Sequence, residues 1–142
     1  MGLGLVSYAV SFGGAAQAES SIDIRGAYAR VASKAAKSGA VFMSIHNTGT
    51  TDDQLIGAQS DVARRVELHS HSSGADGVVR MRQVEEGFPI AAGGYHLLTR
   101  SKDHVMLMGL THPLAEGDML PLTLTFRQAG RIHIMVPVGR DR

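Results

Sequence analysis

From Ile22 onward the sequence consists of short, alternating apolar runs separated by clusters of turn-forming residues. Alternating side chains lie on opposite faces of an extended strand, and no segment keeps a helical period for long. About eight or nine strands are expected, which predicts an all-β fold, an antiparallel β-sandwich with Greek-key connections. The expected strands are residues 22–31, 40–47, 54–60, 63–71, 78–84, 95–101, 104–110, 119–130 and 131–138, with a further short strand within 85–94.

The connections between these runs carry typical turn residues. Residues 32–39 are small and polar and leave room for one helical turn. The pair Gly93 and Gly94 is expected to turn the chain, and Gln128-Ala129-Gly130 is expected to form the turn of a closing hairpin.

Residues 1–18 are apolar and uncharged and end in Ala16-Gln17-Ala18. This resembles a secretory signal peptide with its small-residue cleavage pattern, although no Lys or Arg follows Met1. The alternative is an N-terminus that is disordered or packs on the core. The apolar stretch is too short for a membrane span. We therefore expect a signal peptide at residues 1–18 and one exported, periplasmic domain at residues 19–142, without a membrane span.

The composition excludes several functional classes. The formal net charge of +1 gives no electrostatic basis for binding nucleic acid. The 142 residues contain no cysteine, which excludes disulfides, zinc-thiolate sites, iron–sulfur clusters and thiol catalysis within this sequence. It also excludes a blue-copper electron-transfer site, because that site needs a thiolate ligand.

The segment from residue 66 to residue 110 concentrates soft metal-ligand side chains. It holds four of the seven histidines and three of the seven methionines. His104, Met106 and Met108 alternate in HVMLM and would share one strand face, as would His69 and His71 in VELHSHS, while Met81 lies between the two groups. Imidazole and thioether form a neutral, soft ligand set, which suits Cu(I) better than zinc, calcium or magnesium.

The sequence contains no recognised catalytic constellation, and we expect no enzymatic activity. It has no G-x-S-x-G or H-E-x-x-H motif and no glycine-rich phosphate loop in a strand–loop–helix context. Glu85 and Glu86 are adjacent, so on a strand they would face opposite ways and would make a poor acid/base pair. A copper-dependent oxidase or reductase would additionally need a substrate pocket and an open coordination position.

The segments ELH, DGVVRMR, IAAGG, HVMLMGL and EGD–PLTLTF together resemble the periplasmic copper(I) chaperones of the PCu(A)C family. The resemblance implies a cupredoxin-like β-sandwich that binds one Cu(I). Matched to the family pattern, the implied ligands are His69, Met81, His104 and Met106. It further implies a role similar to that of carriers which deliver copper to the dinuclear centre of cytochrome c oxidase subunit II, beside Sco-type proteins.

Two questions about the ligands stay open at this level. His69 and Met81 are separated by one residue more than in the family pattern, so His71, on the same strand face, could replace or supplement His69. His133 and Met135 form a second His-x-Met, for which a structural role is expected and a weak second metal site is the alternative.

Other side chains are expected to be structural. Met108 would lie in the core or beside the site, and His46, His96 and His112 are isolated. The competing interpretation of the whole chain is an exported β-sandwich interaction module with no metal role.

Overall fold

The computed structural model describes residues 21–73 and 75–139, and within these ranges all regular structure is β-strand. The predicted signal peptide, residues 1–18, lies outside the described residues. No helix of the described part is long and apolar enough to cross a membrane. The strands are β1 (Ile22–Arg30), β2 (Ser38–Asn47), β3 (Asp53–Gln59), β4 (Ala63–Ser73), β5 (Val79–Gln83), β6 (Phe88–Ile90), β7 (Tyr95–Leu98), β8 (His104–Leu110), β9 (Met119–Phe126) and β10 (Gly130–Gly139).

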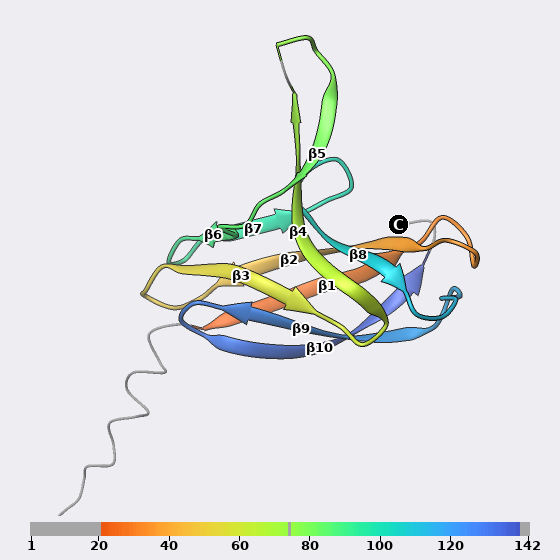
Figure 1. Ribbon diagram of the computed structural model, residues 1–142. Helices are drawn as coiled ribbons and strands as arrows, with labels where there is room; N and C mark the ends of the chain where they lie inside the picture. The colour runs from red at the N-terminus through yellow and green to blue at the C-terminus, as the bar shows by residue number, and fades with distance from the viewer. Residues whose placement is uncertain (1–20, 74, 140–142) are drawn as a thin grey trace, which may run out of the picture.

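The strands pair in the order β5-β4-β8-β2-β1-β10-β9-β3-β6, and β7 also pairs with β2. This path folds into two layers that face each other (Figure 1). One layer contains β1, β2, β4, β5, β7 and β8, and the other contains β3, β6, β9 and β10. The predicted all-β sandwich is confirmed, with one parallel pair, β1 with β10, joining the layers in an otherwise antiparallel arrangement.

The hydrophobic core lies between the two layers and follows the alternation seen in the sequence. On β2 the inward side chains Val41 and Ile45 are fully buried, and on β9 Leu120 and Leu124 are fully buried. Met43 and Leu122, at the middle inward positions of these two strands, are also buried in the core, whereas the alternate side chains project from the outer faces of the layers. This alternation decides which side chains are available to a ligand, because only outer positions reach the surface.

The ends of several strands differ from the prediction for local reasons. The connection between β1 and β2 forms turns and bends instead of a helical turn. β7 stops at Leu98 because Thr99 and Asp103 close a backbone turn, in which the Thr99 amide donates to the Asp103 carbonyl at 3.0 Å. The closing hairpin is confirmed, and Gly130 adopts a φ of 81° at its turn, a value that glycine tolerates best.

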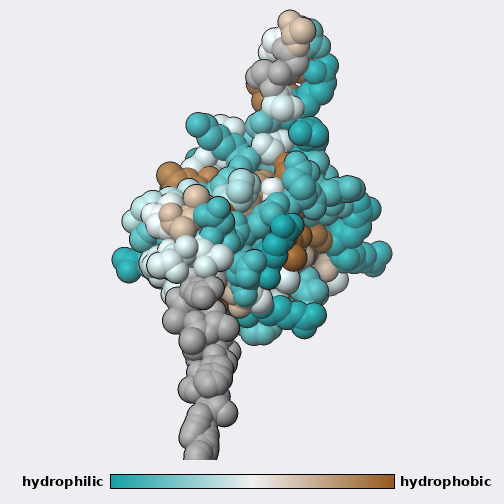
Figure 2. Space-filling model, turned by 90° about the vertical axis from the view of Figure 1, so that its left-hand side faces the viewer, coloured by the Kyte–Doolittle hydropathy of each residue, from teal (hydrophilic) through white to brown (hydrophobic). Residues whose placement is uncertain are grey.

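The far part of β4 and all of β5 form an arm that leaves the body of the sandwich. β4 pairs with β8 from Ala63 to His69, whereas from His69 onward it pairs with β5. Beyond His69 the hairpin is therefore two-stranded, and it projects above the layers (Figures 1 and 2). Every residue of β5 is exposed. We call this hairpin, consisting of β4 beyond His69 together with β5, the β4–β5 arm.

Candidate metal site

The base of the β4–β5 arm lies beside the first residues of β8, in the same layer. On β8 the side chains of Val105 and Leu107 are fully buried in the core, so the alternating His104 and Met106 project outward. β4 pairs antiparallel with β8, and this register places His69 directly opposite His104. Directly opposite side chains on neighbouring strands have Cβ atoms about 4.5–5.5 Å apart, so the two imidazoles are close neighbours.

Met81 reaches the same face from the other side of β4. Its position on β5 is directly opposite His71, and His71 shares a strand face with His69. Met81 is therefore a diagonal neighbour of His69 across the β4–β5 pair. The four residues that the sequence singled out, His69, Met81, His104 and Met106, all project from one face of three adjacent strands.

Three histidine rings gather at this point. The His104 ring centroid lies 5.8 Å from that of His69 and 5.4 Å from that of His71. Phe42, on β2, packs 6.1 Å from the His104 ring on its other side. His104 is only 2% exposed, so its ring is held by packing as well as by hydrogen bonds.

One backbone carbonyl fixes the protonation pattern of two of these rings. The Nδ1 atoms of His71 and His104 lie 3.1 and 3.0 Å from the carbonyl oxygen of Lys102. Because a carbonyl oxygen only accepts hydrogen bonds, each Nδ1 must carry the proton. In the neutral rings the lone pair then lies on Nε2, the atom left available for a metal ion.

His69 is held in the opposite tautomer by Glu67. Its Nε2 lies 2.8 Å from a carboxylate oxygen of Glu67, which requires Nε2–H as the donor. Its Nδ1 is buried and has no hydrogen-bond partner among the described residues. A buried polar atom without a partner is costly in a folded protein, and an unprotonated Nδ1 facing a metal ion would remove that cost. The carboxylate–histidine pair is also a common support for metal-bound imidazoles.

The electrostatics favour a neutral His104 and a charged Glu67. Burial lowers the pKa of His104 below its ordinary value, and the neighbouring His71 and His69 act in the same direction. The hydrogen bond from His69, followed by that from Arg65, lowers the pKa of Glu67. At neutral pH the His104 ring is therefore uncharged, which is the form that a Cu(I) ligand would need.

The methionines differ in accessibility. Met81 is 46% exposed, whereas Met106 is half-buried beside Glu67, its partner on β4. Met108 lies one step farther along β8, opposite Arg65, roughly 6.5 Å beyond Met106. Among the described residues, no three His, Asp or Glu side chains are arranged to hold a metal ion by themselves. A site here would therefore depend on the thioethers.

A hollow opens beside the histidines. It has a volume of about 380 Å³, and its lining includes His71 and Lys102 on one side and Val79 and Leu97 on another. Of the three neighbouring rings, only that of His71 borders this hollow.

Sequence reasoning missed the groups that orient the rings. Glu67 could have been found, because it alternates with His69 and His71 in VELHSHS and so shares their face. The Lys102 carbonyl could not have been found, because its role depends on the turn between β7 and β8. The remaining histidines have other partners: His46 stacks on Tyr95, His96 contacts Asp103, His112 contacts Thr111 and His133 contacts Thr123.

Solved structures with a similar architecture include copper-bound proteins. The copper(I)-bound form of DR1885 from Deinococcus radiodurans is 30% identical, with a TM-score of 0.65 and coverage of 82% of this chain and 76% of that one. The copper-bound PCuAC domain from PmoF2 superposes with a TM-score of 0.69 over 84% of this chain and 92% of that one. At 21% identity, this second likeness concerns the fold alone. The fold is thus of the cupredoxin-like PCuAC type, which confirms the resemblance found in the sequence.

The chain belongs to the family described as "Putative lipoprotein LpqE-like", whose model matches residues 22–138. A relative, "Putative lipoprotein Lxx21020" from Leifsonia xyli subsp. xyli, is 36% identical over 107 residues. The aligned region covers 74% of this chain and 64% of that relative. The chain therefore spans less than two thirds of the length of the relative.

Proposed function

We propose that this protein is an exported copper(I) carrier that binds one Cu(I) through His69, Met81, His104 and Met106. The observation that carries the proposal is the pair of imidazoles at the base of the arm. His104 presents Nε2 and His69 presents an unpartnered, buried Nδ1, with their rings 5.8 Å apart. The names of the solved relatives support copper as the ligand.

The ligand set suits a carrier because it is neutral and soft. Thioethers have no proton to lose and the imidazoles bind in their neutral form, so the positive charge of Cu(I) stays uncompensated. Such a site releases its ion more readily than one built from thiolates. The exposed Met81 leaves the site open to a partner.

His69 is favoured over His71 as the first-strand ligand. His69 lies directly opposite His104 and its Nδ1 lacks a partner, whereas His71 lies one step out along the arm. We expect His69→Ala to weaken Cu(I) binding more than His71→Ala does. Equal losses, or a larger loss for His71→Ala, would reverse the assignment.

The test of the copper site is an anaerobic titration with Cu(I) in competition with a chromophoric Cu(I) chelator. The wild type should bind at least one Cu(I) tightly, and His104→Ala combined with Met106→Leu should lose that tight equivalent. Met108→Leu is the matched control, since it changes a methionine on the same strand face outside the proposed ligand set. X-ray absorption on the loaded protein should count both nitrogen and sulfur neighbours.

Absence of stoichiometric copper at micromolar protein would favour the alternative, an exported interaction module without a metal role. If the tightly bound Cu(I) survives the double substitution, the copper site lies elsewhere in the chain. Either result would contradict the proposal.

The biological setting is part of the same proposal. Residues 1–18 would direct export and be removed, residues 19–142 would form the periplasmic carrier domain, and the protein would have no catalytic activity. The lipoprotein names of the family and the Leifsonia xyli relative support a location in the cell envelope. The proposed acceptor is the dinuclear copper centre of cytochrome c oxidase subunit II, with Sco-type proteins acting beside it.

The acceptor is tested by mixing the Cu(I)-loaded protein with the metal-free soluble domain of subunit II. After separation, copper should be found on the subunit II domain. In a second mixture, with a metal-free Sco-type domain in its place, less copper should be transferred. Copper that stays on the carrier in both mixtures would exclude these acceptors.

A further inference from the structure

The outer face of the other layer carries a second group of soft side chains. His133 and Met135 alternate on β10, and Val136, next to them, is fully buried in the core, so both project outward. Met119 projects from β9 on the same face. We propose that His133, Met135 and Met119 form a second, weaker site for Cu(I), on the opposite layer from His104 and independent of it.

The register of the β9–β10 hairpin brings the two methionines together. Met135 lies directly opposite Pro121, and Met119 lies directly opposite Pro137. Met119 and Met135 are therefore diagonal neighbours, with Cα atoms about 7–8 Å apart. Two unbranched thioether side chains, each with three rotatable bonds, can place both sulfur atoms on one ion over that separation.

His133 supplies a nitrogen at the next outward position. Its Nδ1 lies 2.8 Å from the hydroxyl oxygen of Thr123, the residue directly opposite. A metal ion at Nε2 requires the tautomer with the proton on Nδ1, and the Thr123 oxygen accepts that hydrogen bond. This hydrogen bond also restricts rotation of the ring.

Exposure sets these methionines apart from methionines that fill a core. Among the described residues, the methionines named as strongly exposed are Met81, Met119 and Met135, at 46%, 53% and 57%. Core packing explains a buried methionine such as Met43, but it does not explain the solvent-exposed side chains of Met119 and Met135. Met81 belongs to the proposed carrier site, and the other two lie side by side next to a histidine.

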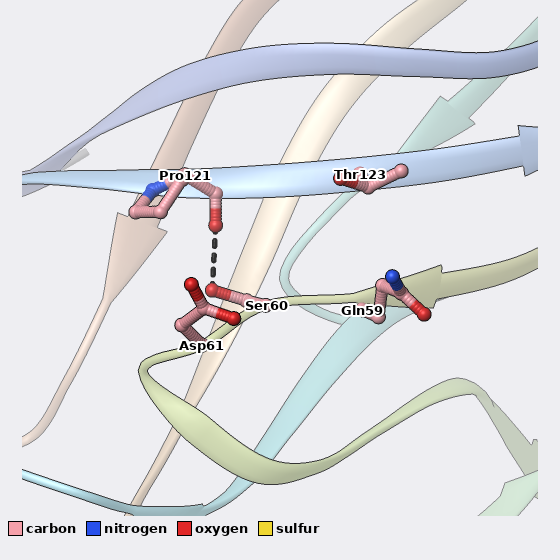
Figure 3. A pocket seen from close by; sticks show the side chains of 5 residues that line it. All are labelled: Gln59, Ser60, Asp61, Pro121 and Thr123. Atoms are coloured by element: carbon pink, nitrogen blue, oxygen red, sulfur yellow. Dashed lines mark hydrogen bonds between the residues drawn. The ribbon is translucent and has the colours of Figure 1, made fainter.

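The surroundings select a soft, monovalent ion. The residues directly opposite the three proposed ligands are uncharged: Thr123, Pro121 and Pro137. Pro121 and Thr123 also border a hollow of about 300 Å³, whose lining includes the Asp61 carboxylate, which is not among the proposed ligands. There the Ser60 hydroxyl donates to the Pro121 carbonyl and ties the β3–β4 turn to β9 (Figure 3). Without a carboxylate ligand, the site offers hard divalent cations little.

The second site should be the weaker of the two. No carboxylate supports His133 as Glu67 supports His69, and such support is worth about 10- to 100-fold in metal affinity. The ligands are also exposed and must lose side-chain freedom on binding. We therefore expect filling of the His104 site first, followed by the His133 site at higher free Cu(I).

The test is an anaerobic Cu(I) titration of the full chain, followed by the methyl NMR signals of its methionines and by chelator competition. Two equivalents should bind, and the Met119 and Met135 methyl signals should shift with the second. Met119→Leu combined with Met135→Leu should remove the second equivalent without changing the unfolding temperature, because the swap conserves volume at the surface. Arg131→Ala, on the same face of β10, should keep both equivalents.

The variants separate this inference from the proposed carrier function. His104→Ala combined with Met106→Leu should retain the weaker equivalent at His133. A wild type that binds one Cu(I), lost only in the His104 variant, would overturn the second site and leave the carrier site standing. A wild type that binds one Cu(I), lost only when Met119→Leu and Met135→Leu are combined, would support the second site and contradict the carrier site. Methyl signals of Met119 and Met135 that never shift would also overturn the inference.

Discussion

Each imidazole at the base of the arm has one ring nitrogen occupied by an oxygen acceptor. Lys102 provides that oxygen for His71 and His104, and Glu67 provides it for His69. The acceptor decides which nitrogen keeps a lone pair, so the metal-binding atoms are chosen before any metal arrives. At the scale of the residue, the site is defined as much by these oxygens as by the proposed ligands.

Replacing Glu67 tests this role directly. Glu67→Gln keeps the size of the side chain but can donate to His69 as well as accept from it, so the Nδ1 lone pair is no longer assured. We expect the Cu(I) affinity to fall by about 10- to 100-fold with an unchanged stoichiometry. Competition with a Cu(I) chelator measures the loss. Glu86→Gln, an exposed carboxylate on a turn, is the control, and an equal loss in both variants would contradict the role of Glu67.

The pH dependence follows from the buried ring. Burial lowers the pKa of His104, so this ligand stays neutral while the pH falls through its ordinary value of about 6.5. At His104 protons compete with copper only below that range, and we expect the Cu(I) affinity to be nearly constant above neutrality and to fall below about pH 6.

His104→Met separates the contribution of this ring from that of His69. A thioether does not titrate, so the steepness of the acid loss should decrease from about two protons per copper towards one. Chelator competition between pH 5 and pH 8 measures the slope. An unchanged slope in His104→Met, or an affinity in the wild type that is flat down to pH 5, would count against imidazole ligation.

At the scale of the element, the β4–β5 arm is the part that the core supports least. β5 pairs only with β4 and is exposed along its whole length, and a two-stranded hairpin has little stability of its own. Met81 belongs to this strand, whereas His104 and Met106 belong to β8, which is paired on both sides. A metal ion shared between them would connect the arm to the body.

Hydrogen exchange should detect this connection. Cu(I) is expected to slow amide exchange in β5 of the wild type, because the arm can open only when the Met81 sulfur leaves the ion. Met81→Leu should remove most of this protection while the amides of β8 stay protected. Val79→Ala, on the same strand face, should behave like the wild type. Protection that persists in Met81→Leu would show that Met81 does not hold the ion.

The sequence predicted the positions of the strands well, but it did not predict which strands pair with each other. The period of two identified β8 to the residue, because its inward positions are fully apolar. The extension of β4 to Ser73 was missed, since the polar run after His71 resembles a loop. The parallel pairing of β1 with β10 and the pairing of His69 with His104 depend on long-range register, which alternation alone does not specify.

At the scale of the whole molecule, a buried carboxylate joins segments that are far apart in the chain. Asp53 is 5% exposed and accepts hydrogen bonds from the amides of Gln128 and Ala129, at 2.7 and 3.0 Å. It thereby holds the β9–β10 turn against the start of β3. These contacts lie in the opposite layer from the proposed copper ligands.

Asp53→Ala should therefore destabilise the fold and leave the copper site intact. Its loss leaves two turn amides without their acceptor, and we expect the free energy of unfolding to fall by roughly 2–4 kcal/mol. Urea unfolding measures this, with Asp52→Ala as the adjacent control, since Asp52 is exposed and accepts from the Ala92 amide. The Cu(I) affinity of the folded Asp53→Ala protein should match that of the wild type. A copper loss as large as the stability loss would mean that the two layers are coupled.

The shared Lys102 oxygen has a mechanical consequence. His71 and His104 come from different strands, yet both rings are steered by one peptide group in the Thr99–Asp103 turn. A tilt of that peptide plane would move the Lys102 oxygen and so reorient the His71 and His104 rings, whose Nδ1 atoms are bonded to it. A movement of this turn would thus displace the proposed ligand His104 without any contact to its ring.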